Sequence, residues 1–437
     1  MKFKNVDAVF ICTLNIDQVL EKHGVQTLVA QIERNAICAE SMRAGSPEDL
    51  MQQVYKRNDS MLLSKSYQTA KRFYRLKLAP PASAEDWIEN CFVILSIFST
   101  GVAALTLWMQ LREVDLERIL ELRRVAFSYW LPLTKMKIRL QLPKPLSGQK
   151  EGVSCDELVQ KYVAHLEMLI SQVERRTSGI NVMSIYPIFF VRETEPPVNN
   201  VGRTTLLNSE LHSLLYDTFS WRRLDKDAIR VANISPNLLV GRYLTDACAL
   251  ELFRQDLREE LVEYADRRDH LSVEEEFLGQ ESSTVIIIEV ARVLLSTLKS
   301  IDSLVARRRE TTSLKEMTQL KKKVLSVLDE YASIGIAARS FERGIFNYAK
   351  NVMGIEELYT QVHNKLELLD RTVFLLYDKR LRERTILLQS LAAAMTIFIV
   401  AISILELFMK VDPILRVLIL VPLLIAATLL PWALSEE

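Results

Sequence analysis

The hydrophobic pattern is strongest near the C-terminal end of the sequence, where two long uncharged runs flank a short polar loop. The first run covers residues 385–405, and about 21 helical residues span roughly 30 Å, the thickness of the hydrocarbon core of a bilayer. The second run covers residues 417–434 and includes Pro422 and Pro431, which membrane helices tolerate. Trp432 lies where an interfacial aromatic residue is expected. This pattern predicts a two-helix transmembrane hairpin.

A third uncharged run extends from Cys91 to Leu111 and is also long enough to cross a bilayer. It differs from the other two because Ser99, Thr100 and Gly101 interrupt its centre, with β-rich stretches on either side. A polar centre between two such stretches is typical of a β-hairpin, and glycine can supply a positive φ at the turn. We therefore expect two buried antiparallel strands here instead of a third span.

The part of the chain before residue 280 is expected to form two α/β units. Residues 1–147 begin with a strand near Val6–Leu14, which leads into a helix starting at Asn15 or two residues later. A linker containing proline and glycine follows. Residues 154–279 then form the second unit, which ends in a charged helix predicted over Asp246–Arg268.

Residues 282–384 have an almost entirely helical pattern. Ser313 and Glu316 form a capping box, and Gly354 marks a junction. A coiled-coil-like seam follows at Leu366, Leu369, Val373 and Leu376. A helix that continued from there into the first apolar run would be roughly 75 Å long. The expected fold class is α+β: a soluble α/β head, a long helical stalk or coiled coil, and the transmembrane hairpin at 385–434.

Charge around the first apolar run predicts how the chain is oriented. Four basic residues stand directly before the run: Lys379, Arg380, Arg382 and Arg384. The loop between the two runs carries only two, Lys410 and Arg416. The positive-inside rule then places the soluble part and both termini on the cytoplasmic or matrix side, in an inner or plasma membrane, with the four basic residues against lipid phosphates. The five cysteines are scattered and odd in number, which agrees with a reducing compartment.

Composition and motifs point away from catalysis. Lys+Arg and Asp+Glu both number 55, so the basic excess of a nucleic-acid binder is missing. The five histidines show no metal-ligand spacing, and no phosphate-binding loop or nucleophile elbow is found. The acidic triplet Glu274–Glu276 is best explained as a solvated helix start. We therefore predict no catalytic residue, no metal and no cofactor.

A few polar side chains interrupt the first apolar run. Thr385, Gln389 and Thr396 recur at spacings of four and seven, which brings them onto roughly one helical face, and Ser403 lies further along. These four residues are the candidates for a polar pore lining. Packing between membrane helices is the favoured alternative, since small polar residues serve that role as well.

Two resemblances to known families add expectations. The order of head, stalk helix, span, short loop and second span resembles the CorA-type magnesium transporters. Those proteins carry a Gly-Met-Asn motif at the end of the first span, whereas residues 404–410 here are Ile-Leu-Glu-Leu-Phe-Met-Lys. The resemblance is therefore one of architecture, and it implies a divalent-cation transporter as one alternative.

The second resemblance is to the membrane-anchored family required for meiotic nuclear division. It is carried by three local stretches: Val6–Leu14, Ile97–Trp108 and Glu357–Leu368. That family ordinarily has one C-terminal span, whereas two are predicted here. The resemblance implies a self-associating membrane scaffold and supplies no catalytic residues.

The expected function is that of a non-enzymatic, oligomeric membrane protein. A sensing head would be coupled by the stalk to a hairpin that forms a pore or perturbs the membrane, and several copies are required because two spans cannot enclose a channel. A membrane-anchored tethering scaffold is the alternative. The expected partners are the lipid bilayer, further copies of the chain, and a protein or small-ligand trigger on the head.

Overall fold

The structure of the chain is a computed structural model, and it contains most of the predicted helices and strands. The described residues are 1–16, 22–34, 47–62, 71–75, 87–98, 100–127, 155–174, 180–198, 204–206, 209–216, 230–235, 239–267, 272–307, 318, 321–322, 324–325 and 340–408.

A seven-stranded sheet forms the centre of the described structure, with strand order β2-β3-β4-β1-β5-β9-β8. The first strand, β1, lies in the middle and pairs antiparallel with both β4 and β5. Among the described strands, only β5 and β9 are parallel neighbours. The strands are β1 (Lys2–Asn15), β2 (Lys71–Arg75), β3 (Ile88–Ile97), β4 (Val102–Asp115), β5 (Asn181–Glu195), β8 (Val240–Leu244) and β9 (Ala249–Phe253). A separate two-stranded sheet contains β6 (Thr204–Leu206) and β7 (Arg230–Ala232).

The hairpin predicted in the third apolar run is confirmed. β3 and β4 pair antiparallel, and both are buried over Phe92–Ile97 and Val102–Met109, the ends nearer the turn. Gly101 has φ 80° at the turn, and its amide donates to the carbonyl of Phe98 at 3.1 Å. This run is apolar because its strands are covered on both faces of the sheet. Its hydropathy is therefore as high as that of a membrane span.

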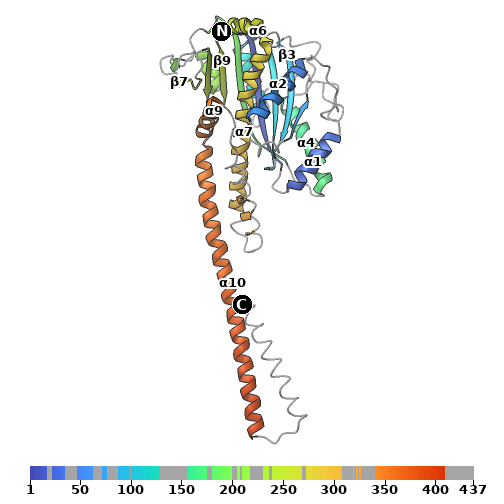
Figure 1. Cartoon of the computed structure of the whole chain (residues 1–437), viewed down its shortest axis with the longest axis vertical. Helices are drawn as coiled ribbons and strands as arrows, with labels where there is room; N and C mark the ends of the chain where they lie inside the picture. The colour runs from blue at the N-terminus through green and yellow to red at the C-terminus, as the bar shows by residue number, and fades with distance from the viewer. Residues whose placement is uncertain are drawn as a thin grey trace. The chain divides into compact units, whose positions relative to one another are not determined.

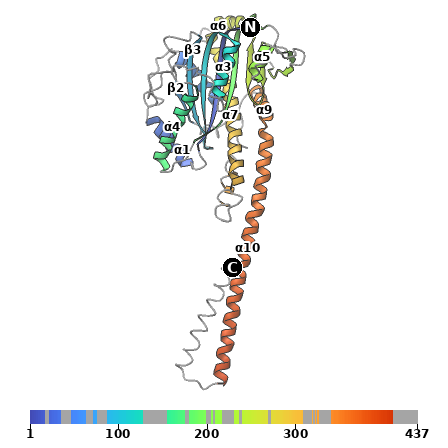
Figure 2. The same ribbon diagram turned by 180° about the vertical axis from the view of Figure 1, so that it is seen from behind.

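Helices cover both faces of the sheet. In Figure 1, α7 (Val273–Arg307) and α2 (Pro47–Leu62) lie in front of it. Figure 2 shows α3 (Leu116–Phe127) and α4 (Cys155–Glu174) on the opposite side. Leu28 and Ile32 of α1 (Lys22–Arg34) belong to the same apolar core as α3, α4 and α5 (Ser209–Tyr216).

The two predicted α/β units are not separated in the structure. β5, β8 and β9, expected in a unit over residues 154–279, pair into the same sheet as the strands of residues 1–147. The division into compact units lies elsewhere: one unit is Met1–Leu304 with Ser326–Val362, and the other is Val305–Leu325 with His363–Glu437. We call the first unit the head. The predicted linker lies outside the described residues, and the pairing of β1 with β5 joins strands from either side of it in one sheet.

The predicted helix over Asp246–Arg268 is wrong in its first part. Its beginning forms strand β9, and α6 covers only Gln255–Arg267. β9 is an inner strand that is buried along its whole length. Its sequence, Ala-Leu-Glu-Leu-Phe, has a buried charged residue at its centre, so neither a continuous apolar run nor an apolar–polar alternation marks it as a strand. At the N-terminal side, β1 extends through Asn15, so no helix begins at that residue.

The C-terminal helices follow the predicted stalk. α9 (Ser340–Val352) and α10 (Ile355–Phe408) meet at Gly354, whose φ is 67°. α10 continues without a break through the first apolar run, as predicted. Along the expected seam, Leu366 and Leu369 are buried while Val373 and Leu376 are half-buried. Lys321 forms an ion pair with Asp370 of α10. The coiled coil itself stays a prediction.

The second half of the predicted hairpin falls outside the described residues. Residues 417–434, the interfacial Trp432 and the intervening loop belong to this part, as does the capping box at Ser313 and Glu316. Within the described chain, α10 is the one helix long and apolar enough to cross a membrane, and none of its most apolar window is buried.

Candidate functional site

Buried charge is concentrated where α7 packs on the sheet. The opposite face is apolar: alternate residues of the same strands, such as Phe10, Leu105 and Phe189, join a continuous hydrophobic core. Side chains one position away point to the α7 face, since strand residues alternate in direction. They include Asp7 and Arg192, which are both buried. The sheet therefore has one uniformly apolar face and one face with charges in it.

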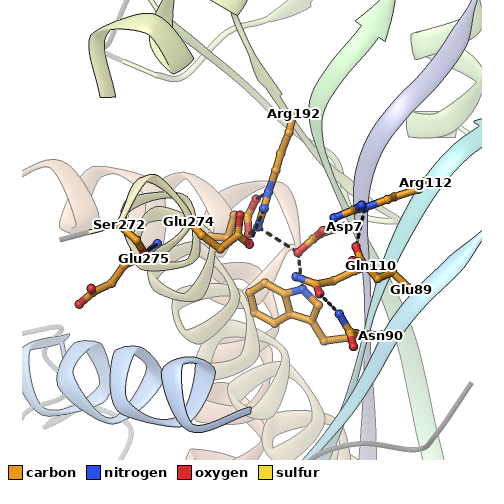
Figure 3. A network of polar contacts seen from close by, with 11 residues as sticks. Asp7, Glu89, Asn90, Gln110, Arg112, Arg192, Ser272, Glu274 and Glu275 are labelled. Carbon is orange, nitrogen blue, oxygen red and sulfur yellow. Dashed lines mark hydrogen bonds and ion pairs between the residues drawn. The ribbon is translucent and has the colours of Figure 1, made fainter. Parts of the chain in front are cut away.

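Arg192 of β5 is the centre of this charged cluster, shown in Figure 3. Its Nε and Nη2 donate to the two carboxylate oxygens of Glu281, both at 2.6 Å, in a bidentate pair. Its Nη1 donates to Glu274 at 2.7 Å, and Nη2 also lies 3.2 Å from Asp7. Asp7 and Glu281 have fully buried side chains, whereas Glu274 is 46% exposed. One arginine thus joins β1, β5 and two turns of α7.

Asp7 extends the cluster into the sheet. Trp108 of β4 donates its indole N–H to Asp7 Oδ2 at 2.7 Å, and the ring stacks on Phe190 with centroids 5.9 Å apart. Gln110 also hydrogen bonds the Asp7 carboxyl, and it accepts from the Asn90 side chain at 2.8 Å. A chain of polar side chains therefore crosses four neighbouring strands, from Asn90 on β3 through Gln110 on β4 and Asp7 on β1 to Arg192 on β5.

The cluster contains more negative than positive groups, and this shifts its protonation. Burial raises the pKa of Asp7, against the opposing effects of Arg192 and Trp108. Burial likewise raises the pKa of Glu281 well above its usual range, even though Arg192 pulls it down. Burial opposes the charge of Arg192, but Asp7 and Glu281 outweigh it and raise the pKa of the guanidinium. Glu281 therefore holds a proton far more readily than an exposed glutamate does.

Two cavities of the head reach Arg192. One, of about 230 Å³, lies against α2, the first turns of α7 and strands β1, β3 and β4; its lining includes Met51, Phe92, Asn90, Gln110, Arg112 and Glu274. The other, of about 240 Å³, is lined by Lys4, Thr194, Pro197, Phe253 and Gln255, among others. Arg192, whose side chain pairs with α7, is therefore a lining residue of both cavities.

Polar contacts continue along the rest of α7. Glu251 of β9 accepts from Thr284 and pairs with Arg242, all three being buried. Further on, Glu289 accepts from the Tyr55 hydroxyl at 3.1 Å, and Arg292 lies over the Tyr186 ring at 5.0 Å.

In the last turns of α7 that belong to the head, hydroxyl groups instead of charged groups make the contacts with the sheet. Ser296 donates to Thr13 at 2.8 Å, and Thr13 shares a 2.7 Å hydrogen bond with Ser184. The Asn15 amide donates to Ser300 at 3.2 Å. The interface of α7 with the sheet is thus held by specific polar pairs over its whole length, in addition to apolar packing.

Sequence patterns did not identify this cluster. Asp7 lies within the apolar run of β1, Arg192 directly follows the apolar run of β5, and Glu281 and Glu289 lie in the generally apolar α7. A charged residue inside an apolar run is a signal of a buried pair, since charges are rarely buried alone. The acidic triplet predicted as a solvated helix start does begin α7, but Glu274 is paired with Arg192. Within the described residues, no group of His, Cys, Asp and Glu is arranged to hold a metal ion.

The predicted membrane residues lie on α10, away from this cluster in sequence and in a different compact unit. Thr385, Gln389, Thr396 and Ser403 are all exposed. The three hydroxyl groups donate to carbonyls one turn earlier in α10, at 2.8–2.9 Å. Lys379, Arg380, Arg382 and Arg384 are also exposed. The polar and basic candidates thus all lie on one helix, α10.

In comparisons with known proteins, the chain matches no protein-family model, no curated protein and no solved structure.

Proposed function

We propose that the protein is a membrane-anchored effector in which a non-enzymatic sensing head controls a C-terminal membrane segment. The observation that carries this proposal is α10, a 54-residue helix that begins with buried residues of the head. Ile355 and Val362 are fully buried, whereas Ile386, Leu388 and Ile397 are each more than 60% exposed. An exposed apolar helix of this length is costly in water and suited to a bilayer.

The polar interface of α7 supports a sensing role for the head. α7 begins beside the cavity and the Arg192 cluster, and it ends in the second compact unit, at Arg307. Interfaces held by buried ion pairs respond to protonation or to a ligand that competes for a partner. A small-ligand or protein trigger at the head would therefore act on α7 first. The positive-inside rule puts the head on the cytoplasmic or matrix side.

A tethering scaffold is the second candidate, and the hydroxyl groups of α10 favour it. Thr385, Thr396 and Ser403 satisfy their own hydrogen bonds within the helix. They therefore require neither a water-filled lumen nor a partner helix in lipid. In this case the helix would hold the head at the membrane, and any self-association would come from other surfaces.

Replacement of the membrane segment distinguishes the two candidates. The full-length chain and a version with an unrelated anchor after Arg384 are reconstituted in liposomes, and ion and dye fluxes are measured across a pH series. An effector is expected to give flux that the replaced anchor abolishes. Absence of flux from both forms under every condition would contradict the pore and membrane-perturbing role and leave the tether.

Coupling is tested separately by hydrogen exchange. Arg192→Leu should change amide exchange in residues 363–384, because a loosened α7 no longer holds the head in one state. Leu105→Ala, on the apolar face, serves as the control, because it should lower the free energy of unfolding by a similar amount without removing an α7 contact. Equal exchange in all three proteins over 363–384 would contradict coupling between head and stalk.

A further inference from the structure

The four basic residues directly before the first apolar run fall into two groups, those with an acidic partner on α10 and those without one. Arg382 Nη2 lies 2.9 Å from Asp378 Oδ2, and Lys379 Nζ lies 3.9 Å from Glu383 Oε1. Both pairs are four residues apart on α10, a spacing that brings helical side chains together. Two of the four cations therefore have a local carboxylate that offsets their charge.

Arg380 and Arg384 are different. Both are exposed, and neither makes an ion pair with any described residue. They are also four residues apart, so they project from the same face with a rise of about 6 Å between them. The next residue, Thr385, begins the uncharged run. Two guanidinium groups thus stand together at the edge of the segment that enters the membrane.

An apolar surface continues directly below this arginine pair. Leu387 and Leu388 lie three and four residues after Arg384, hence on the same side of the helix, and they are 36% and 66% exposed. The two features together suit an amphiphile: the arginines meet a negative phosphate, and the leucines meet an acyl chain. A free phosphate ion would use only the upper half of this surface.

We propose that Arg380 and Arg384 form a binding site for the phosphate of an anionic phospholipid headgroup, an inference that rests on the proposed membrane anchoring of α10. Guanidinium groups bind phosphate through paired N–H donors, which fixes geometry as well as charge. The headgroup layer lies directly outside the hydrocarbon core, at the level that the start of the apolar run defines. The site would hold α10 at a set depth in an anionic leaflet.

The test uses the full-length protein reconstituted in phosphatidylcholine vesicles that contain spin-labelled lipid. The association constant of spin-labelled phosphatidylglycerol, relative to that of spin-labelled phosphatidylcholine, reports selectivity at the protein surface. The wild type is expected to prefer the anionic lipid. Arg380→Gln with Arg384→Gln should lower the ratio by about 30-fold, the combined effect expected of two basic residues at an anionic membrane surface. Lys379→Gln with Arg382→Gln is the matched control and should keep most of the preference.

The control separates a site from a diffuse field, because both double variants remove the same net charge. An equal loss in the two variants would overturn the site, and so would an unchanged ratio in Arg380→Gln with Arg384→Gln. Loss of the wild-type preference on addition of inorganic phosphate, compared with chloride at equal ionic strength, would overturn the assignment to a lipid. Failure of the wild type to float with the vesicles at all would overturn the membrane anchoring and this site with it; a normally incorporated protein without selectivity would overturn the site alone.

Discussion

The two faces of the central sheet are buried to a similar degree but by different chemistry. On the face covered by α3 and α4, the strands contribute Phe10, Leu105, Leu107 and their apolar neighbours. On the face covered by α7, the same strands contribute Asp7, Thr13 and Arg192, each in a specific hydrogen bond or ion pair. Apolar packing tolerates many arrangements, whereas a buried ion pair is stable only with its own partners. The contacts on the α7 face are therefore the ones whose contribution to stability should depend on pH.

Removal of the central cation should have the largest effect. Arg192→Leu leaves Asp7 and Glu281 buried without a counter-charge, and loss of one partner of a buried pair costs about 3–5 kcal/mol. Chemical denaturation of the full-length protein in mild detergent, followed by circular dichroism, measures the free energy of unfolding. The triple variant that also carries Asp7→Asn and Glu281→Gln should recover much of the loss. A triple variant no more stable than Arg192→Leu would contradict the charge explanation.

Truncation of a side chain on the apolar face should lower the free energy of unfolding by a comparable or smaller amount, and this loss should not depend on pH. Leu105 is fully buried in the core, and Leu105→Ala is expected to cost about 2–5 kcal/mol because it leaves a cavity. The loss should be the same at all pH values, since the nearby core residues are apolar. The same denaturation experiment at several pH values checks this. A loss that grows with pH would show that the two faces are not independent.

Removal of the Trp108 hydrogen bond to Asp7 should have a smaller effect than either of these substitutions. Trp108→Phe keeps the aromatic stacking on Phe190 but removes the N–H donor to Asp7. A hydrogen bond to a charged group contributes about 1.5–3 kcal/mol. The combination with Asp7→Asn should be less than additive, because both substitutions act on the same contact. Full additivity in a double-mutant cycle would sink this assignment.

Stability should also depend on pH through the α7 face. The pKa values of Asp7 and Glu281 are raised in the folded protein. Their contribution is therefore fully present below the unfolded pKa, near 4, and it is lost as the pH rises through the raised folded pKa. Arg192, Glu274, Trp108 and Gln110 are the groups that face this pair.

Each unit of pKa elevation corresponds to about 1.4 kcal/mol of stability lost at high pH. Amide exchange along residues 273–304, corrected for its intrinsic pH dependence, should increase with pH in the wild type. Glu281→Gln mimics the protonated form and should remove most of this dependence, whereas Glu275→Gln, outside the buried pair, should retain it. Identical pH profiles for the wild type and Glu281→Gln would contradict the role of the carboxyl.

Much of the fold follows from local pattern, and the exceptions have a common cause. The hairpin around Gly101, the strand near Val6–Leu14 and the stalk helix were all predictable because turn chemistry and periodicity are local properties. The strand over Ala249–Phe253 was not, because its central Glu251 is buried by a pairing with Arg242 that the local sequence does not reveal. The pairing of β1 with β5 was also out of reach, since residues far apart in the chain leave no periodic signal of their contact.

The candidate site was less predictable than the fold. Arg192, Glu281 and Asp7 are up to 274 residues apart in the sequence numbering, and each by itself is an ordinary charged residue in an apolar context. Nothing in their spacing says that one guanidinium meets two buried carboxylates. The basic residues before the apolar run were predicted as a group, but their division into paired and unpaired members required the side-chain geometry of α10.

The sequence by itself determined the local features of this protein: a long apolar helix preceded by basic residues, a β-hairpin at a glycine turn, and a mixed α/β content. These depend on contacts within a few residues, which the order of side chains specifies. Only the tertiary structure decided that residues before and after the long connection share one sheet, and that α7 is held to it by charges. Both depend on contacts between segments that are far apart in the chain. Burial at these contacts then raises the pKa of Asp7 and Glu281.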